Sequence, residues 1–478
     1  MVCARSARHL TGRQIMYPAM RDKRRRALSI AAIVFISVSA RAETSIDDPA
    51  LRTRQTTLDN GLTVLTLEDH TTPVVSFQMW VRVGSRDEAR LTGLAHMFEH
   101  MMFKGTKAIG PEQHERLIAS RGGRSNAYTT RDVTVYTADV TSQALPLVIA
   151  LEAERVANLE ISESTLASER EVVIEERRMR TDDSPSGKAL EALFSLAFQA
   201  HPYRWPVIGW ASDIANTTVA ASREFFAEYY VPNNITLVIV GDFDSAAALE
   251  QIEQTFGHLE AAQSISRNTT EEPVQDGARR ADVHFDVRSP ILALAWPAPR
   301  SGHADSESLD VLSQILSAGR SSRLYRRLIY DEQVALSARG GYWEWADAGV
   351  FYAYASARPG ERVERVEELF LEEIAKLREN PVSASELDKA KRQIEVSMVK
   401  QLSTNRAVAN RIGFDVTVLG RIRPLADRLA AIRSVSVADV QRVAREYLRS
   451  DRRNVVHVIP EPETERAPSG APLAGSGS

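Results

Sequence analysis

The five residues His96-Met97-Phe98-Glu99-His100 form the most informative motif of this 478-residue chain. On an α-helix, His96 and His100 are four positions apart, so their imidazoles project from one face, about 6 Å apart along the axis. Two histidines and one carboxylate are a common ligand set of catalytic zinc, which keeps one position for water. Glu99 lies beside His100, where its carboxylate could act as the general base on that water. The motif predicts a metal-dependent hydrolase, and its ligand types favour zinc without excluding manganese or cobalt.

The flanking residues indicate that this helix is buried, rather than a solvated surface helix. The motif lies between the apolar segments 93–95 (GLA) and 101–103 (MMF), and three ionisable side chains on a buried helix need partners. A third ligand must come from elsewhere in the chain. The predicted helix over residues 163–180 offers Glu169, Glu175 and Glu176, of which Glu169 and Glu176 share a face. Spacing alone does not choose among these three carboxylates.

Together these motifs resemble a known family. The motif at 96–100, the following residues 103–106 (FKGT) and the run 169–176 (EREVVIEE) are similar to those of the pitrilysin/insulysin-type inverzincin zinc metallopeptidases. The chain length resembles the short, two-domain branch that includes mitochondrial processing peptidase. The resemblance covers almost the whole chain after its N-terminal segment. It implies one Zn²⁺ per chain, with His96, His100 and Glu176 as ligands, Glu99 as the catalytic base and Glu169 as a supporting carboxylate.

A second segment resembles the family's substrate-binding strand. Residues 122–136 (GGRSNAYTTRDVTVY) match the edge strand on which family members lay an extended peptide. The free N–H and C=O groups of such a strand bind peptide by β-augmentation, which makes Asn126, Ala127 and Tyr128 the expected substrate-binding residues. For the Asn126 side chain, a hydrogen bond to substrate competes with a local turn bond. The segment 201–203 (HPY) also resembles a family segment near the cleft, where a structural histidine is favoured over a catalytic one.

The second half departs from the family pattern at one point. Residues 319–325 (GRSSRLY) fit, but the Arg and Tyr that bind the substrate carbonyl in the family align with Ile329 and Leu336. Tyr330 could replace them only through a shifted alignment. This loss predicts a heteromeric partner, a homologous subunit that lacks the zinc motif and carries the Arg/Tyr pair.

The chain divides into two similar halves. Residues 262–280 are polar, without apolar periodicity, and read as a linker. They separate an N-terminal zinc-bearing catalytic domain (43–261) from a C-terminal homologous domain without zinc (281–460), and the tail 461–478 is expected to be disordered. A helix followed by a strand recurs near the end of each half, at 219–240 and 437–459, which indicates an internal duplication.

The periodicity of apolar residues predicts a mixture of strands and long helices. The expected class is therefore α+β. The family resemblance implies two homologous α/β-sandwich domains, each with a mixed, mainly antiparallel sheet, that form a clamshell around a chamber. The predicted strands are 61–67, 74–83, 133–138, 291–296 and 350–355, and the predicted helices are 93–103, 145–159, 163–180, 306–328 and 362–379.

The N-terminal segment is typical of a secretory signal. Basic residues between 21 and 26 precede the apolar stretch 27–40, which ends in Ala40-Arg41-Ala42, a signal-peptidase pattern. We expect a cleavable signal over residues 1–42, with Met20 as an alternative start, and a periplasmic protein. A membrane anchor is the alternative, but the stretch is short for a stable span. Cys3, the one cysteine, belongs to this segment, so disulfides and cysteine-based zinc clusters are excluded.

Composition excludes several classes of protein. The chain is 44% hydrophobic and 26% charged, which is typical of a globular protein. Nine of its 59 basic and one of its 63 acidic residues lie in the first 42 positions, so the remainder has a formal net charge of −12, which argues against nucleic acid as a partner. The sequence predicts a secreted zinc endopeptidase acting on unfolded polypeptides or oligopeptides bound as an added strand. The alternative is a non-catalytic peptide-binding or assembly subunit, which the intact zinc set disfavours.

Overall fold

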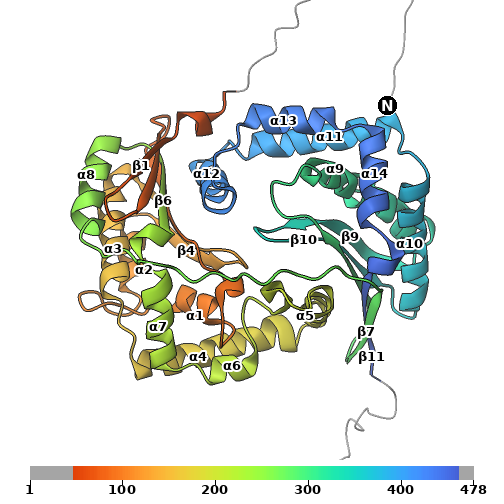
Figure 1. The fold of residues 1–478 in the computed structure, drawn as a ribbon, viewed down its shortest axis with the longest axis horizontal. Helices are drawn as coiled ribbons and strands as arrows, with labels where there is room; N and C mark the ends of the chain where they lie inside the picture. The colour runs from red at the N-terminus through yellow and green to blue at the C-terminus, as the bar shows by residue number, and fades with distance from the viewer. Residues whose placement is uncertain (1–46, 462–478) are drawn as a thin grey trace, which may run out of the picture. The chain divides into compact units, whose positions relative to one another are not determined.

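The computed structural model describes residues 47–461, which contain two β-sheets with helices packed on them (Figure 1). The expected signal, residues 1–42, and residues 462–478 of the expected tail lie outside the described residues. Between residues 47 and 461, no helix combines the length and hydropathy that crossing a membrane requires. The two sheets and their helices confirm the α+β class with two α/β-sandwich domains.

The first sheet has six strands in the order β1-β2-β6-β3-β5-β4. Strands β2 and β6 are parallel, and the other neighbouring pairs are antiparallel. Because β4 ends the order, the segment that resembles the substrate-binding strand lies at a sheet edge. The strands are β1 (Arg54–Thr57), β2 (Thr63–Glu68), β3 (Val74–Val81), β4 (Arg124–Thr129), β5 (Thr134–Thr141) and β6 (Ile235–Gly241).

The second sheet repeats the topology of the first. Its order is β7-β11-β8-β10-β9, with β7 parallel to β11 and the other pairs antiparallel, so it matches β2-β6-β3-β5-β4 strand for strand. This correspondence supports the internal duplication inferred from the two helix–strand repeats. The strands are β7 (Arg279–Phe285), β8 (Ile291–Ala298), β9 (Ala335–Glu344), β10 (Gly349–Ala357) and β11 (Asn454–Pro460).

Amphipathic helices cover one face of each sheet. The core of the first half contains buried residues of α1, α3, α4, α7 and α8, and that of the second half contains buried residues of α9, α10, α11, α13 and α14. Their buried residues recur at three- and four-residue intervals, as a helix packed on a sheet requires. The helices of the first half are α1 (Leu94–Met101), α2 (Gln113–Ser120), α3 (Leu145–Asn158), α4 (Glu163–Arg177), α5 (Pro185–Ala197), α6 (Ala211–Ala215), α7 (Val219–Tyr229) and α8 (Ser245–Phe256); those of the second are α9 (Ser306–Ser317), α10 (Val363–Glu379), α11 (Ala384–Lys400), α12 (Asn405–Leu419), α13 (Leu425–Ser434) and α14 (Val437–Tyr447).

The opposite face of each sheet is covered by a helix from the other half. Helix α5 packs on the second sheet, where Leu193 lies in one apolar cluster with residues of β8 and β11, and α12 packs on the first sheet through Ile412 (Figure 1). Gly413 permits this approach, because a Cβ there would lie 2.2 Å from the indole of Trp80. Each half therefore contributes a helix that completes the sandwich of the other half. The two halves of the sequence do not pack independently.

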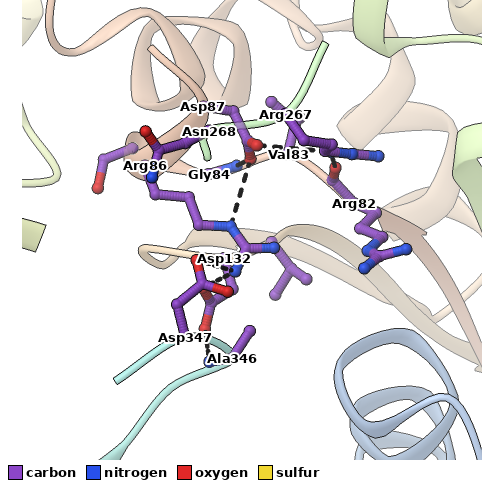
Figure 2. Close-up of polar contacts among 12 residues, drawn as sticks. Arg82, Val83, Gly84, Arg86, Asp87, Asp132, Arg267, Asn268, Ala346 and Asp347 are labelled. Carbon is purple, nitrogen blue, oxygen red and sulfur yellow. Dashed lines mark hydrogen bonds and ion pairs between the residues drawn. The ribbon is translucent and has the colours of Figure 1, made fainter. Parts of the chain in front are cut away.

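A partly buried polar junction also joins the halves and the linker (Figure 2). The guanidinium of Arg86 lies 3.0 Å from Asp132 of the β4–β5 turn and 2.9 Å from Asp347, which belongs to the β9–β10 turn of the second half. Arg267 of the linker lies 3.5 Å from Asp87. Arg86, Asp87 and Asp132 are buried, and buried charges need partners. Asp347 and Arg267 supply partners from the second half and from the linker, so the junction ties the three parts together.

Two predicted helices end earlier than expected. The helix predicted over 306–328 was wrong in its second part: α9 stops at Ser317, Ala318 is extended, and Gly319 has φ +76°, a conformation that favours glycine. A π-helical turn, η7 (Tyr325–Asp331), follows. The helix predicted over 163–180 becomes α4 followed by a second π-helical turn, η4 (Arg178–Asp182).

Candidate metal centre and peptide cleft

His96 and His100 project from α1 toward Glu176 of α4. The Nε2 atoms of His96 and His100 lie 3.6 and 3.3 Å from Oε2 of Glu176, and one ligand atom from each of the three residues lies within 4.8 Å of the others. This buried Oε2 has no hydrogen-bond partner among the described residues. An orphaned carboxylate oxygen that faces two imidazoles is the environment of a bound cation, so the residues present fit zinc.

Glu88 fixes the start of the helix that carries both histidines. Its two buried carboxylate oxygens accept hydrogen bonds from the backbone N–H groups of Gly93 and Ala95, at 2.8 and 2.9 Å. These are unpaired amides at the N-terminus of α1, where a carboxylate is stabilising. Gly93 itself has φ +89°, and a Cβ there would lie 2.5 Å from the carbonyl oxygen of Ile208. Glu88 was not predicted from the sequence, although an acidic residue shortly before a helix start is a signal for such a cap.

Glu99 lies on α1 beside the three grouped residues without joining them. Its Oε2 accepts a hydrogen bond of 2.7 Å from the hydroxyl of Thr129, at the end of β4. Burial raises the pKa of Glu99, and the bond from Thr129 opposes that shift. A partly buried carboxylate with a raised pKa is suited to accept a proton near neutral pH.

The two histidines have opposite pKa shifts. Burial, together with the neighbouring His100, lowers the pKa of His96 to about 4, so this imidazole is neutral at pH 7. Burial has the same effect on His100, but the neighbouring carboxylates of Glu169 and Glu176 outweigh it and raise the pKa of His100 to about 9. Because a metal binds neutral imidazole, a cation at this position would displace the proton of His100.

The structure separates the three carboxylates that spacing left open. Glu169 is buried behind His100, with Oε2 3.4 Å from Nδ1 of His100 and Oε1 2.8 Å from the ammonium of Lys104. A carboxylate on the second ring nitrogen orients a ligating histidine. Glu175 is exposed and pairs with Arg178 on the helix surface. Glu176 alone among them joins the histidines.

A cleft of about 1040 Å³ connects this group to the edge strand. It is lined by His96, Glu99 and His100, by residues 126–129 of β4, by the exposed side of α4 and η4, and by Val207 and Ile208. Along β4, Ala127 packs on the first core and Tyr128 on the cluster around α12, so Asn126 and Tyr128 share one face. The structure thus brings Asn126, Ala127 and Tyr128 to the cleft, and no side-chain hydrogen bond of Asn126 is found in the described residues.

Comparison with known proteins identifies the family. The protein-family model described as "Insulinase (Peptidase family M16)" matches residues 63–209, and the family model described as "Peptidase M16 inactive domain" matches residues 216–394. The chain belongs to peptidase family M16. The family resemblance inferred from the motifs at 96–100 and 169–176 is confirmed.

The relatives of this M16 chain include proteins named zinc proteases and a processing-peptidase subunit. It is 32% identical to zinc protease PqqE of Helicobacter pylori over 91% of its own length and 99% of the relative, and 26% identical to a probable mitochondrial-processing peptidase β subunit of Arabidopsis thaliana over 84% of its length and 77% of the relative. The crystal structure of a protease from Helicobacter pylori superposes with a TM-score of 0.82 at 33% identity, covering 85% of this chain and 99% of that one. A Pseudomonas fluorescens M16 inactive-domain structure shares the fold, with a TM-score of 0.79 at 19% identity.

Ile329, Tyr330 and Leu336 are not among the described residues that line this cleft. Within the described residues, the cleft lining runs from His96 to Ile208 and includes no residue of the second half. Tyr330 is 71% exposed and Leu336 is also exposed. His201 lies 3.3 Å from Asp347 in the polar junction between the halves, which is a structural role.

Proposed function

We propose that this M16 chain is a secreted, periplasmic zinc endopeptidase that hydrolyses unfolded polypeptides or oligopeptides. The observation that carries the proposal is the grouping of His96, His100 and Glu176 around one orphaned carboxylate oxygen, with Glu99 beside them in the same cleft. Zinc proteases among the relatives support the same metal.

The residues of the chain have separate tasks in this reaction. When bound, Zn²⁺ supplies a Lewis acid that lowers the pKa of water and polarises a carbonyl. His96, His100 and Glu176 hold the ion, and Glu169 keeps the ring of His100 oriented. The carboxylate of Glu99 takes the proton of the attacking water and returns it to the leaving amine. Because Thr129 occupies Oε2 of Glu99, Oε1 remains for this transfer.

The edge strand β4 binds the substrate in an extended conformation. Within residues 47–461 its outer edge has no neighbouring strand, so backbone N–H and C=O groups between Asn126 and Thr129 pair with those of a peptide. Backbone pairing needs no particular side chains, which favours extended and unfolded substrates over folded ones. The peptide then runs past Glu99 and the two histidines.

Zinc content and peptide cleavage, measured together, test the proposal. We expect one zinc per chain, cleavage of a denatured polypeptide that a chelator abolishes and zinc restores, and resistance of the same substrate when folded. Full zinc occupancy without cleavage, even with the partner subunit present, would refute the peptidase and favour a non-catalytic peptide-binding or assembly subunit.

The proposal includes a heteromeric partner of the same fold. The family's Arg/Tyr pair is replaced here by Ile329 and Leu336, so a homologous subunit without the zinc motif would supply it. Mixing the two purified subunits should raise the cleavage rate well above that of either alone, and substituting the partner's Arg should remove the gain. Full activity of this chain alone would refute the partner.

The proposed localisation rests on residues 1–42, whose pattern is that of a secretory signal. N-terminal sequencing of the protein recovered from a periplasmic fraction should find Glu43 as the first residue. Recovery of an uncleaved chain from the membrane fraction would favour the anchor.

A further inference from the structure

One permanently charged cation lies in the peptide cleft. Among the described residues that line it, Arg180 is the only arginine or lysine; the others are acidic, apolar, small, polar or histidine. Arg180 belongs to the π-helical turn η4 directly after α4, and its side chain is 73% exposed. Single π-helical turns in α-helices are frequent at functional sites.

Arg180 contacts the metal-site carboxylate through the oxygen that does not face the histidines. Its NH1 lies 2.7 Å from Oε1 of Glu176, whereas Oε2 of the same carboxylate faces both imidazoles. A guanidinium has five N–H donors in a planar fork. Glu176 is the one polar partner that the structure records for Arg180 within the described residues. Most of these donors therefore have no protein partner there, on a side chain that lines the cleft.

We propose that Arg180 donates hydrogen bonds to the oxyanion formed at the scissile carbonyl, and so supplies from this chain part of the carbonyl binding that positions 329 and 336 lack. The inference rests on the proposed peptidase function. As the water oxygen bonds to the carbonyl carbon, the C=O π electron pair moves to the carbonyl oxygen and the water proton moves to Glu99. Arg180 transfers no proton; its N–H groups stabilise the negative oxygen. When the C–N bond breaks, that pair reforms the carbonyl, and the amine leaves with the C–N electron pair and the proton from Glu99.

This role explains how the chain alone would retain a basal rate. A partner subunit adds its own donors to the same oxyanion, so Arg180 and the partner's Arg act together instead of replacing each other. The charge of Arg180 is permanent, because a guanidinium does not lose its proton in proteins. It therefore contributes at any pH at which Glu99 is ionised.

Arg180→Gln and its matched control Arg178→Gln test the inference in the full chain. Arg178 belongs to the same turn, is 60% exposed and pairs with the surface carboxylate of Glu175. For Arg180→Gln we expect kcat to fall by about 100- to 1000-fold, with KM and zinc affinity within about twofold of wild type, and partial recovery in Arg180→Lys. Arg178→Gln should match wild type in all three quantities.

Binding of a transition-state analogue supplies a readout besides activity. A peptide with a tetrahedral phosphinate in place of the scissile bond should bind Arg180→Gln more weakly than wild type by about the same factor as kcat falls. Unchanged phosphinate affinity, or an unchanged kcat, would overturn the role. A parallel loss of zinc would instead show that Arg180 only positions Glu176. If wild type shows no zinc-dependent cleavage, the proposed function fails and this role fails with it.

Discussion

Three isosteric substitutions on α4 separate a metal ligand from its support and from a surface carboxylate. Glu176, Glu169 and Glu175 are all glutamates of one helix, with side chains 14%, 1% and 51% exposed. Glu169→Gln keeps the shape of the group behind His100 but removes its charge, which should weaken zinc binding by about 10- to 100-fold, or about 1.4 to 2.8 kcal/mol. Glu176→Gln removes the oxygen charge that faces both imidazoles and should weaken it by more than that. Glu175→Gln should change zinc affinity by less than about twofold, because its partner Arg178 lies at the surface.

A competition titration of zinc-free protein against a chromophoric chelator measures this order directly. The three variants should show Glu176→Gln weakest, Glu169→Gln intermediate and Glu175→Gln equal to wild type. Circular dichroism of the zinc-free proteins provides the control for folding. Equal losses at positions 175 and 176, or a larger loss at 169 than at 176, would refute the assignment of Glu176 as the third ligand.

Three further changes test the base, the helix start and the polar junction. Glu99→Gln should abolish cleavage and leave zinc stoichiometry unchanged, because its carboxylate binds no metal; loss of zinc in this variant would contradict the role. Glu88→Ala leaves two buried amides of α1 unpaired, so the unfolding free energy of the zinc-free protein should fall by about 2–6 kcal/mol in urea titration, and a change below about 1 kcal/mol would be inconsistent with the cap. Burial raises the pKa of Asp87 to about 6, although Arg86 and Arg267 oppose that shift. Between pH 4 and 6 the folded protein therefore keeps the proton of Asp87 while the unfolded chain loses it, so the unfolding free energy of wild type should fall by up to about 3 kcal/mol as the pH rises from 4 to 6. The unfolding free energy of Asp87→Asn should change less over the same range. Parallel changes in the two proteins would show that another group titrates.

The metal-binding helix was predictable because its information is local. The four-residue spacing of His96 and His100 places both rings on one face whatever surrounds the helix. Glu99 lies on the same helix, directly before His100, so its position beside the histidines was predictable as well. The sequence could not rank Glu169, Glu175 and Glu176, since the choice depends on how α4 lies against α1. The early end of α9 could also have been predicted locally, because a glycine such as Gly319 commonly ends a helix in the left-handed conformation.

The sequence by itself determined the α+β class, the repeated helix–strand pattern and the histidine pair, because short-range periodicity and residue type control these features. The tertiary structure decided which residues meet across long stretches of chain. The tertiary structure shows that α5 of the first half covers the second sheet and that α12 of the second half covers the first. It also shows that Asp347 contacts Arg86 and that Arg180 lies beside the third ligand, Glu176. Such contacts depend on how whole helices and sheets with complementary apolar faces pack together. The apolar periodicity of one helix or strand shows that it has an apolar face, but it does not specify which other element covers that face.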